Sequence, residues 1–230
     1  RNYFVQQIRT RGRSEVLGHH VNQLAPGLSG GAFHPLIRLA FALEADSDCE
    51  IAESLASWCM AYQELGPLSS NGTQPPLRVL ESVAQLSRKA DQRLQGDTLF
   101  ARMKSAAATP GFTEWNGHIA VDELTLGRLA EVALAIYASS RNGFLAMHLV
   151  TATHAARRVL AHTACRERLL DALGQAFIAA YIVIGCPPIR PSPPGAALPS
   201  WDQVIDSARS STNDHDAKLC FAMKEEQGIY

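Results

Sequence analysis

His34 stands directly before a proline, in the stretch Gly30-Gly31-Ala32-Phe33-His34-Pro35. Because proline lacks a backbone N–H, it is tolerated only in the first turn of a helix, so Pro35 predicts a helix start a few residues upstream, with Ser29 as its N-cap. The helix N-terminus disfavours a protonated imidazole, and the neutral imidazole is the form that binds metals. His34 is therefore a candidate metal ligand, although this stretch alone favours a packed or surface histidine.

A second candidate pair is His148 and His154, within Met147–Arg158. On a helix, residues six apart point about 120° away from each other, so the two rings can flank one cavity but should not both bind one ion. Thr151 lies between them and could hydrogen-bond either ring. The alternative is a core histidine that is satisfied by a backbone carbonyl.

The third candidate pair is His215 and Lys218, which share one helix face because they are three residues apart. Asp214 or Thr212 is the expected cap of that helix. Burial lowers the pKa of a lysine, and the free amine can then take up carbon dioxide to become a carbamate, which is a hard ligand for iron. The spacing alone favours a solvated, charged helix start.

The composition bounds the class of protein. The chain has 230 residues, of which 47% are hydrophobic and 19% charged, and its formal net charge is −1. This is typical of one globular domain and gives no reason to expect nucleic acid or a membrane as a partner. The five cysteines form no Cys-x-x-Cys pair, which indicates reduced thiols and a cytoplasmic location. No dinucleotide fingerprint, phosphate loop, Gly-x-Ser-x-Gly or His-Glu-x-x-His motif is present, so an enzyme here would act through histidines on helices.

Apolar residues recur at helical spacing through most of the chain, and no sustained strand alternation occurs. The fold class is therefore predicted to be all-α, a single multi-helix domain whose helices pack around a central apolar cavity. The apolar end of the helix over residues 166–185 is too short to span a bilayer and is expected to be a core helix. Cys186–Pro199 holds six of the twelve prolines and is expected to be an extended crossing. The expected helices are 2–11, 14–24, one from His34 to near 44, 49–65, 77–90, 97–103, 124–138, 144–162, 166–185, 201–208 and 214–226.

Taken together, three stretches resemble the questin oxidase family. They are Gly31–Ala40 with Ala42-Leu43-Glu44, then Val150-Thr151 with His154-Ala155 and Arg157, then His215 with Lys218. The resemblance covers nearly the whole chain in the right order, so residues 1–230 are expected to form one questin oxidase-like domain. It would begin after the family's N-terminal part, which usually carries further histidines.

The resemblance implies an oxygenase, once described as Baeyer–Villiger-type, that opens or modifies aromatic polyketides such as anthraquinones. It implies a mononuclear non-haem iron (Fe²⁺) held by His34, His154 and His215, with Lys218 as a carboxylated lysine. His148 is expected either to support the metal ligands or to face the substrate, and we assign it a catalytic role together with Arg158. The implied partners are a small aromatic substrate and dioxygen. If the reaction needs a reductant, NADPH is the candidate, and it would be external because no dinucleotide motif is present.

Two other functions remain open at this point. The His215-Asp216 doublet could belong to an all-α metal-dependent phosphohydrolase, and the histidines could be structural in a non-catalytic helical binding protein. Metal content would separate the binding protein from the two enzymes, and dioxygen uptake against phosphate release would separate the enzymes. The residues do not specify the substrate, the product or the oligomeric state.

Overall fold

The structure, a computed structural model, describes residues 1–69, 71–87, 94–141, 143–190 and 199–229, and no β-strand occurs within these ranges. The all-α prediction is therefore confirmed. The described helices are α1 (Asn2–Arg11), α2 (Arg13–Leu24), α3 (His34–Glu44), α4 (Asp48–Ala61), α5 (Pro76–Ser87), α6 (Leu99–Ala107), α7 (Phe112–Asn116), α8 (Thr125–Ser139), α9 (Gly143–Leu160), α10 (Arg166–Ile184), α11 (Trp201–Ser210) and α12 (Asp214–Gln227). Most expected helices are found within a few residues of their predicted ends; α7 lies in the segment expected to be a connection.

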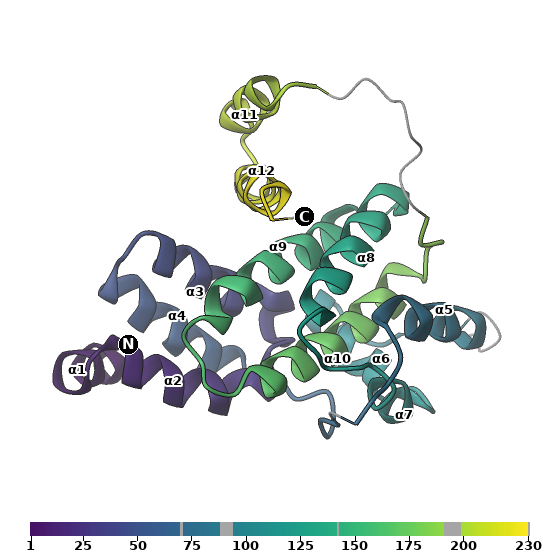
Figure 1. The fold of residues 1–230 in the computed structure, drawn as a ribbon, viewed down its shortest axis with the longest axis horizontal. Helices are drawn as coiled ribbons and strands as arrows, with labels where there is room; N and C mark the ends of the chain where they lie inside the picture. The colour runs from purple at the N-terminus through teal and green to yellow at the C-terminus, as the bar shows by residue number, and fades with distance from the viewer. Residues whose placement is uncertain (70, 88–93, 142, 191–198, 230) are drawn as a thin grey trace.

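Helix α9 is the central element of the bundle (Figure 1). It packs against α3, α8, α10 and α12, and every residue from Leu145 to Ala156 is buried. Helix α10 is buried from Leu169 to Val183, which confirms it as a core helix, and no helix among the described residues is long and apolar enough to cross a membrane. An all-round apolar helix such as α9 can be covered on all sides only by several neighbours.

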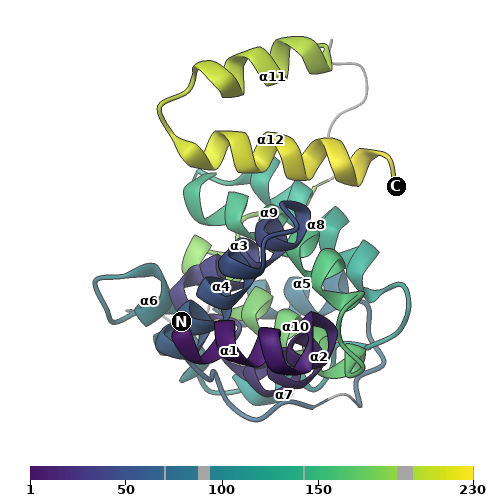
Figure 2. The same cartoon turned by 90° about the vertical axis from the view of Figure 1, so that its left-hand side faces the viewer.

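Helices α11 and α12 form a pair on one side of the bundle (Figure 2). Helix α12 lies on α9, whereas α11 contacts α12 and has no buried residue. The predicted extended crossing over Cys186–Pro199 falls partly outside the described residues, and residues 186–190 are non-helical as expected.

The chain enters α3 through three successive left-handed residues. Gly31, Ala32 and Phe33 have φ values of 58°, 53° and 69°, and Phe33 occupies the N-cap position. Left-handed backbone costs about 1–3 kcal/mol for a non-glycine residue and persists only where the surroundings enforce it, here by full burial of Phe33. His34 and Pro35 follow as the first two helical residues, as predicted. Ser29 precedes the short 3-10 turn Gly30–Phe33 as its N-cap residue but makes no capping hydrogen bond, because its hydroxyl donates to the Gln63 carbonyl; the N-cap of α3 itself is Phe33.

Gly30 allows this turn to pack against α4. A Cβ at Gly30 would lie 1.8 Å from the Ala61 carbonyl oxygen. We therefore expect Gly30→Ala to lower the free energy of unfolding by about 1–3 kcal/mol, the usual cost of overpacking, as measured by urea denaturation.

Gly18→Ala is the matched control, because its Cβ would lie 3.8 Å from the nearest heavy atom and Gly18 is inside α2. This control should be neutral or slightly stabilising, since alanine is the better helix former. Equal stability of the Gly30→Ala variant and the unsubstituted protein would show that the close packing of this turn is unimportant.

Candidate metal centre

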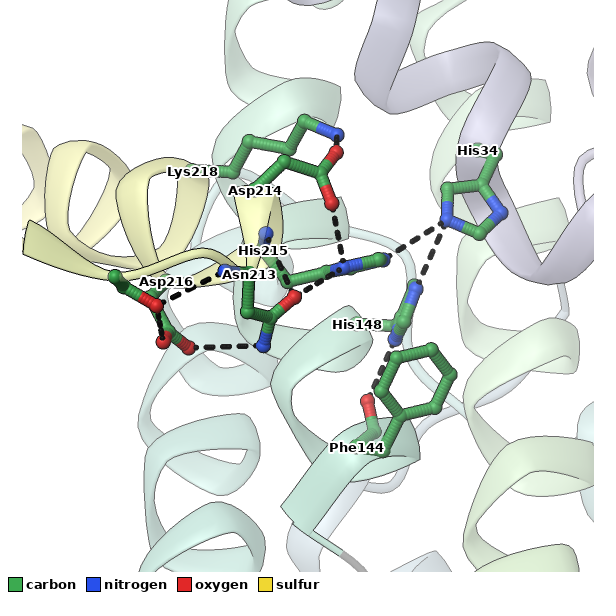
Figure 3. Close-up of polar contacts among 9 residues, drawn as sticks. His34, Phe144, His148, Asn213, Asp214, His215, Asp216 and Lys218 are labelled. Atoms are coloured by element: carbon green, nitrogen blue, oxygen red, sulfur yellow. Dashed lines mark hydrogen bonds and ion pairs between the residues drawn. The ribbon is translucent and has the colours of Figure 1, made fainter. Parts of the chain in front are cut away.

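Three histidines from distant parts of the chain converge on one point (Figure 3). His34 begins α3, His148 lies near the start of α9, and His215 lies in the first turn of α12. The Nε2 atom of His34 is 3.1 Å from Nε2 of His148 and 3.4 Å from Nε2 of His215. Among the described residues, these three form the group whose ligand atoms lie close enough to hold a metal ion, all within 4.8 Å of one another.

Backbone carbonyls orient two of these rings. The Nδ1 atom of His34 lies 2.7 Å from the Gly31 carbonyl oxygen, and Nδ1 of His148 lies 2.6 Å from the Phe144 carbonyl oxygen. A carbonyl can only accept, so each Nδ1 carries the hydrogen and each Nε2 keeps its lone pair. Histidine ligands of metals are held in this way by their second nitrogen. The left-handed turn before α3 therefore presents the Gly31 carbonyl to His34.

His215 is oriented by side chains at the start of its own helix. Its Nδ1 lies 3.0 Å from both Asn213 Oδ1 and Asp214 Oδ1. Asn213 is the N-cap of α12 and accepts from the His215 backbone N–H at 3.2 Å, so neither predicted cap, Asp214 or Thr212, is the observed one. The other Asp214 oxygen pairs with Lys218 Nζ, and this ammonium lowers the pKa of the Asp214 carboxyl.

Burial favours the neutral imidazole of His148. His148 is 1% exposed, and burial, followed by the charges of His34, His215 and Lys218, lowers its pKa to about 4. The pKa of His34 is also lowered, again mainly by burial. Neutral imidazole is the ligating form, so these rings are ready to bind a cation at neutral pH. His34 itself is exposed, and the cluster is therefore open to solvent on its side.

The Phe144 ring lies beside the histidine cluster, and this residue was not identified from the sequence. Its ring centroid lies 4.8 Å from that of His148 and 5.0 Å from that of His215, yet 48% of the residue is exposed. Its position four residues before His148 was the available signal, because residues at this spacing are neighbours on a helix.

The structure does not bring His154 into this group. Its Nδ1 lies 3.0 Å from Glu226 Oε1, and Arg157 also donates to that carboxylate. His154 is six residues beyond His148, so it points about 120° away and lies about 9 Å further along α9. His148, expected to face the substrate, is the residue of α9 that meets His34.

Arg158 also lies away from the cluster. It forms an ion pair with Glu44 near the C-terminal end of α9, about 15 Å along the helix from His148. The hydroxyl of Thr151, expected to reach a histidine ring, donates instead to the backbone carbonyls of Met147 and His148. Neither side chain is part of the histidine cluster in the structure.

A cavity of about 740 Å³ lies between α8, α11 and α12, which is a size that accommodates small ligands. Asp216 lines it and accepts from Asn213 Nδ2 at 3.2 Å, so the cavity and the histidine cluster are joined through Asn213 and His215. The apolar part of its lining includes Tyr137, Val204, Ala208, Leu219, Cys220 and Met223. This cavity is lined mainly by α11 and α12, which lie on one side of the bundle, and the expected central cavity stays a prediction.

Comparison with known proteins identifies the family. The family model described as Questin oxidase-like matches residues 1–223, so the chain belongs to the questin oxidase-like family, as its motifs suggested. No curated protein matches the chain. Family membership indicates an oxidoreductase that acts on a small molecule of the aromatic polyketide class.

The lowered pKa of His148 predicts an acid-sensitive fold in the metal-free protein. Between pH about 6.5 and about 4 the unfolded chain protonates this imidazole and the folded chain does not, so stability is full above pH 6.5 and falls as the pH drops. The loss should be on the order of 3 kcal/mol in the free energy of unfolding.

Urea denaturation at several pH values measures this loss, with His148→Asn as the comparison, since an amide does not titrate. Carboxylates titrate in both proteins, so the difference between the two curves isolates His148. Parallel curves for the two proteins would contradict the assignment.

Proposed function

We propose that His34, His148 and His215 hold one Fe²⁺ and that the protein is a non-haem iron-dependent oxygenase. The observation that carries this proposal is the convergence of three Nε2 atoms whose rings each present Nδ1 to an oxygen. Ligands about 2.1 Å from one ion and 90–110° apart lie about 3.0–3.4 Å from each other, which agrees with the 3.1 and 3.4 Å separations of the two pairs that include His34. The His148 and His215 ligand atoms lie within 4.8 Å of each other. Imidazole suits iron, and three protein ligands leave positions open for dioxygen.

Lys218 is the proposed fourth ligand, as a carbamate. It shares a helix face with His215, and its ammonium and the His215 ring both contact the Asp214 carboxylate, so the partly exposed Lys218 head group lies beside the cluster. Carbon dioxide adds to the free amine, the N–C bond forms and one proton leaves. Carboxylation replaces a cation by an anion, so the carbamate would be repelled by Asp214, its present partner, and attracted to a bound metal.

The proposed substrate is an aromatic polyketide, such as an anthraquinone, which is oxidised or ring-cleaved with dioxygen. The half-exposed Phe144 ring beside His148 and His215 offers a flat apolar surface on which an aromatic substrate can stack. Bound iron would supply the activation of dioxygen, and reducing equivalents would come from an external donor such as NADPH.

The phosphohydrolase alternative loses its main support. Asp216, the acidic member of the His215-Asp216 doublet, accepts from Ser211 and Asn213 and is not part of the group around His34. A hydrolase of that kind would need carboxylate ligands beside its histidines.

Substitution of two of the four proposed ligands, His148 and Lys218, tests this function. The unsubstituted protein should contain one iron ion per chain, and His148→Ala should abolish iron binding, as measured by elemental analysis. Lys218→Ala should lose iron or dioxygen uptake, and acetate or formate should restore part of it by filling the vacated position. Lys218→Arg should not restore it, because a guanidinium neither forms a carbamate nor binds a cation.

His19→Ala is the control, since His19 is an exposed histidine of α2 outside the cluster. It should retain full iron content. Full iron content and turnover in Lys218→Arg would refute the role of Lys218, and full iron content in His148→Ala would refute the site.

A further inference from the structure

Helix α12 carries two of the proposed ligands but buries only a few apolar side chains completely. His215 and Lys218 lie in its first two turns, and its buried residues are Leu219, Ala222 and Glu226. Its partner α11 contributes no buried residue. A helix stabilised by so few apolar contacts needs another interaction to fix its position along α9, because apolar contacts alone tolerate sliding.

That interaction is an ionic cluster at the opposite end of α12. The Glu226 carboxylate is buried, with the side chain 7% exposed, and its Oε1 lies 3.0 Å from Nδ1 of the buried His154. Arg157 donates to it from Nε at 3.0 Å to both oxygens and from Nη2 at 2.8 Å. Burial alone would raise the Glu226 pKa, but the hydrogen bonds from His154 and Arg157 outweigh it and lower the pKa, so the carboxylate is charged.

A buried charge fixes a helix more strictly than apolar contacts do. Removal of its partners leaves a desolvated carboxylate, which is strongly unfavourable, so Glu226 can be buried only where it meets His154 and Arg157. Sliding α12 by one residue would move it 1.5 Å along its axis and turn it by about 100°. The same slide would turn His215 away from His34 and His148. The register set at Glu226 therefore decides whether the three Nε2 atoms meet.

We infer that Glu226, bound by His154 and Arg157, is a positioning residue that sets the register of α12 on α9 and thereby assembles the metal site. The inference rests on the proposed function for the metal, but the docking of α12 can be measured without it. His154 acts on the site through Glu226 and not as a ligand. Coupling between two equilibria is reciprocal, so metal binding must favour the docking of α12 on α9 by the same factor by which this docking favours metal binding.

The test uses the full chain with Co²⁺ alone as the metal probe. Co²⁺ binds the same nitrogen ligands as iron, with somewhat higher affinity, and absorbs in the visible range. The variants are Glu226→Gln, His154→Ala, His154→Asn and the double variant Glu226→Gln/His154→Ala. Glu225→Gln is the matched control, since Glu225 is the exposed neighbour of Glu226 on α12. Hydrogen exchange of α12 amides is measured on the same proteins, with α10 amides as the internal reference.

Glu226→Gln and His154→Ala should each weaken Co²⁺ binding about 10- to 100-fold, the usual effect of removing a group that supports metal ligands. Both should accelerate exchange in α12 and leave α10 unchanged. The double variant should bind no more weakly than the worse single variant, because both act through one contact. His154→Asn should recover most of the affinity, since its amide can donate to Glu226 but is a poor metal ligand. Glu225→Gln should bind Co²⁺ as tightly as the unsubstituted protein. In both of these proteins, Co²⁺ should slow the hydrogen exchange of α12 amides.

Three results would overturn the inference. The first is unchanged Co²⁺ affinity in Glu226→Gln. The second is a double variant that binds Co²⁺ far more weakly than either single variant, together with no recovery of affinity in His154→Asn. That result would show that His154 is itself a ligand. The third is unchanged α12 exchange in Glu226→Gln. If the unsubstituted protein binds no Co²⁺ at all, the proposed function fails, and the exchange data alone still decide whether Glu226 fixes α12.

Discussion

The site depends on one constraint: each imidazole must turn its Nε2 lone pair inward. A free imidazole in water can rotate and can carry its hydrogen on either nitrogen. Here the Gly31 and Phe144 carbonyls and the Asn213 and Asp214 oxygens hold the Nδ1 side of the three rings. Burial keeps His148 neutral, so proton competition is low at the point where a cation would bind. Local backbone carbonyls serve this orientation at His34 and His148, and side chains at the start of α12 serve it at His215.

The rest of the fold brings these oriented rings together. His34 and His215 begin their helices, whereas His148 lies on the buried α9, which contacts both α3 and α12. The left-handed residues before α3 are strained, and the surrounding packing of Gly30 and Phe33 offsets that cost. At the other end of α12, a buried carboxylate adds a polar contact to the few apolar side chains that this helix buries completely. The site is therefore assembled from three helices, and only α9 is buried along most of its length.

Much of the fold could be predicted from the sequence, but the identity of the histidine on α9 could not. Helical periodicity and the His34-Pro35 pair depend on neighbouring residues, so the helices and the position of His34 followed directly. Both His148 and His154 stand on an apolar helix, and their roles depend on which helices cover α9 on each side. Glu226, the partner of His154, is 72 residues away in sequence, and no local pattern links the two. The chemistry of Lys218 remains a prediction, because carboxylation leaves no mark on the sequence.

The central claim is that a single iron ion binds at the Nε2 atoms of His34, His148 and His215. An anomalous difference map at the iron absorption edge, from crystals grown with Fe²⁺ without oxygen, tests it most directly. The account predicts one peak about 2 Å from each of these three atoms, with the His154 ring still hydrogen-bonded to Glu226. A peak bound by His154, or no peak at the three-histidine cluster in a protein that retains iron, would contradict it.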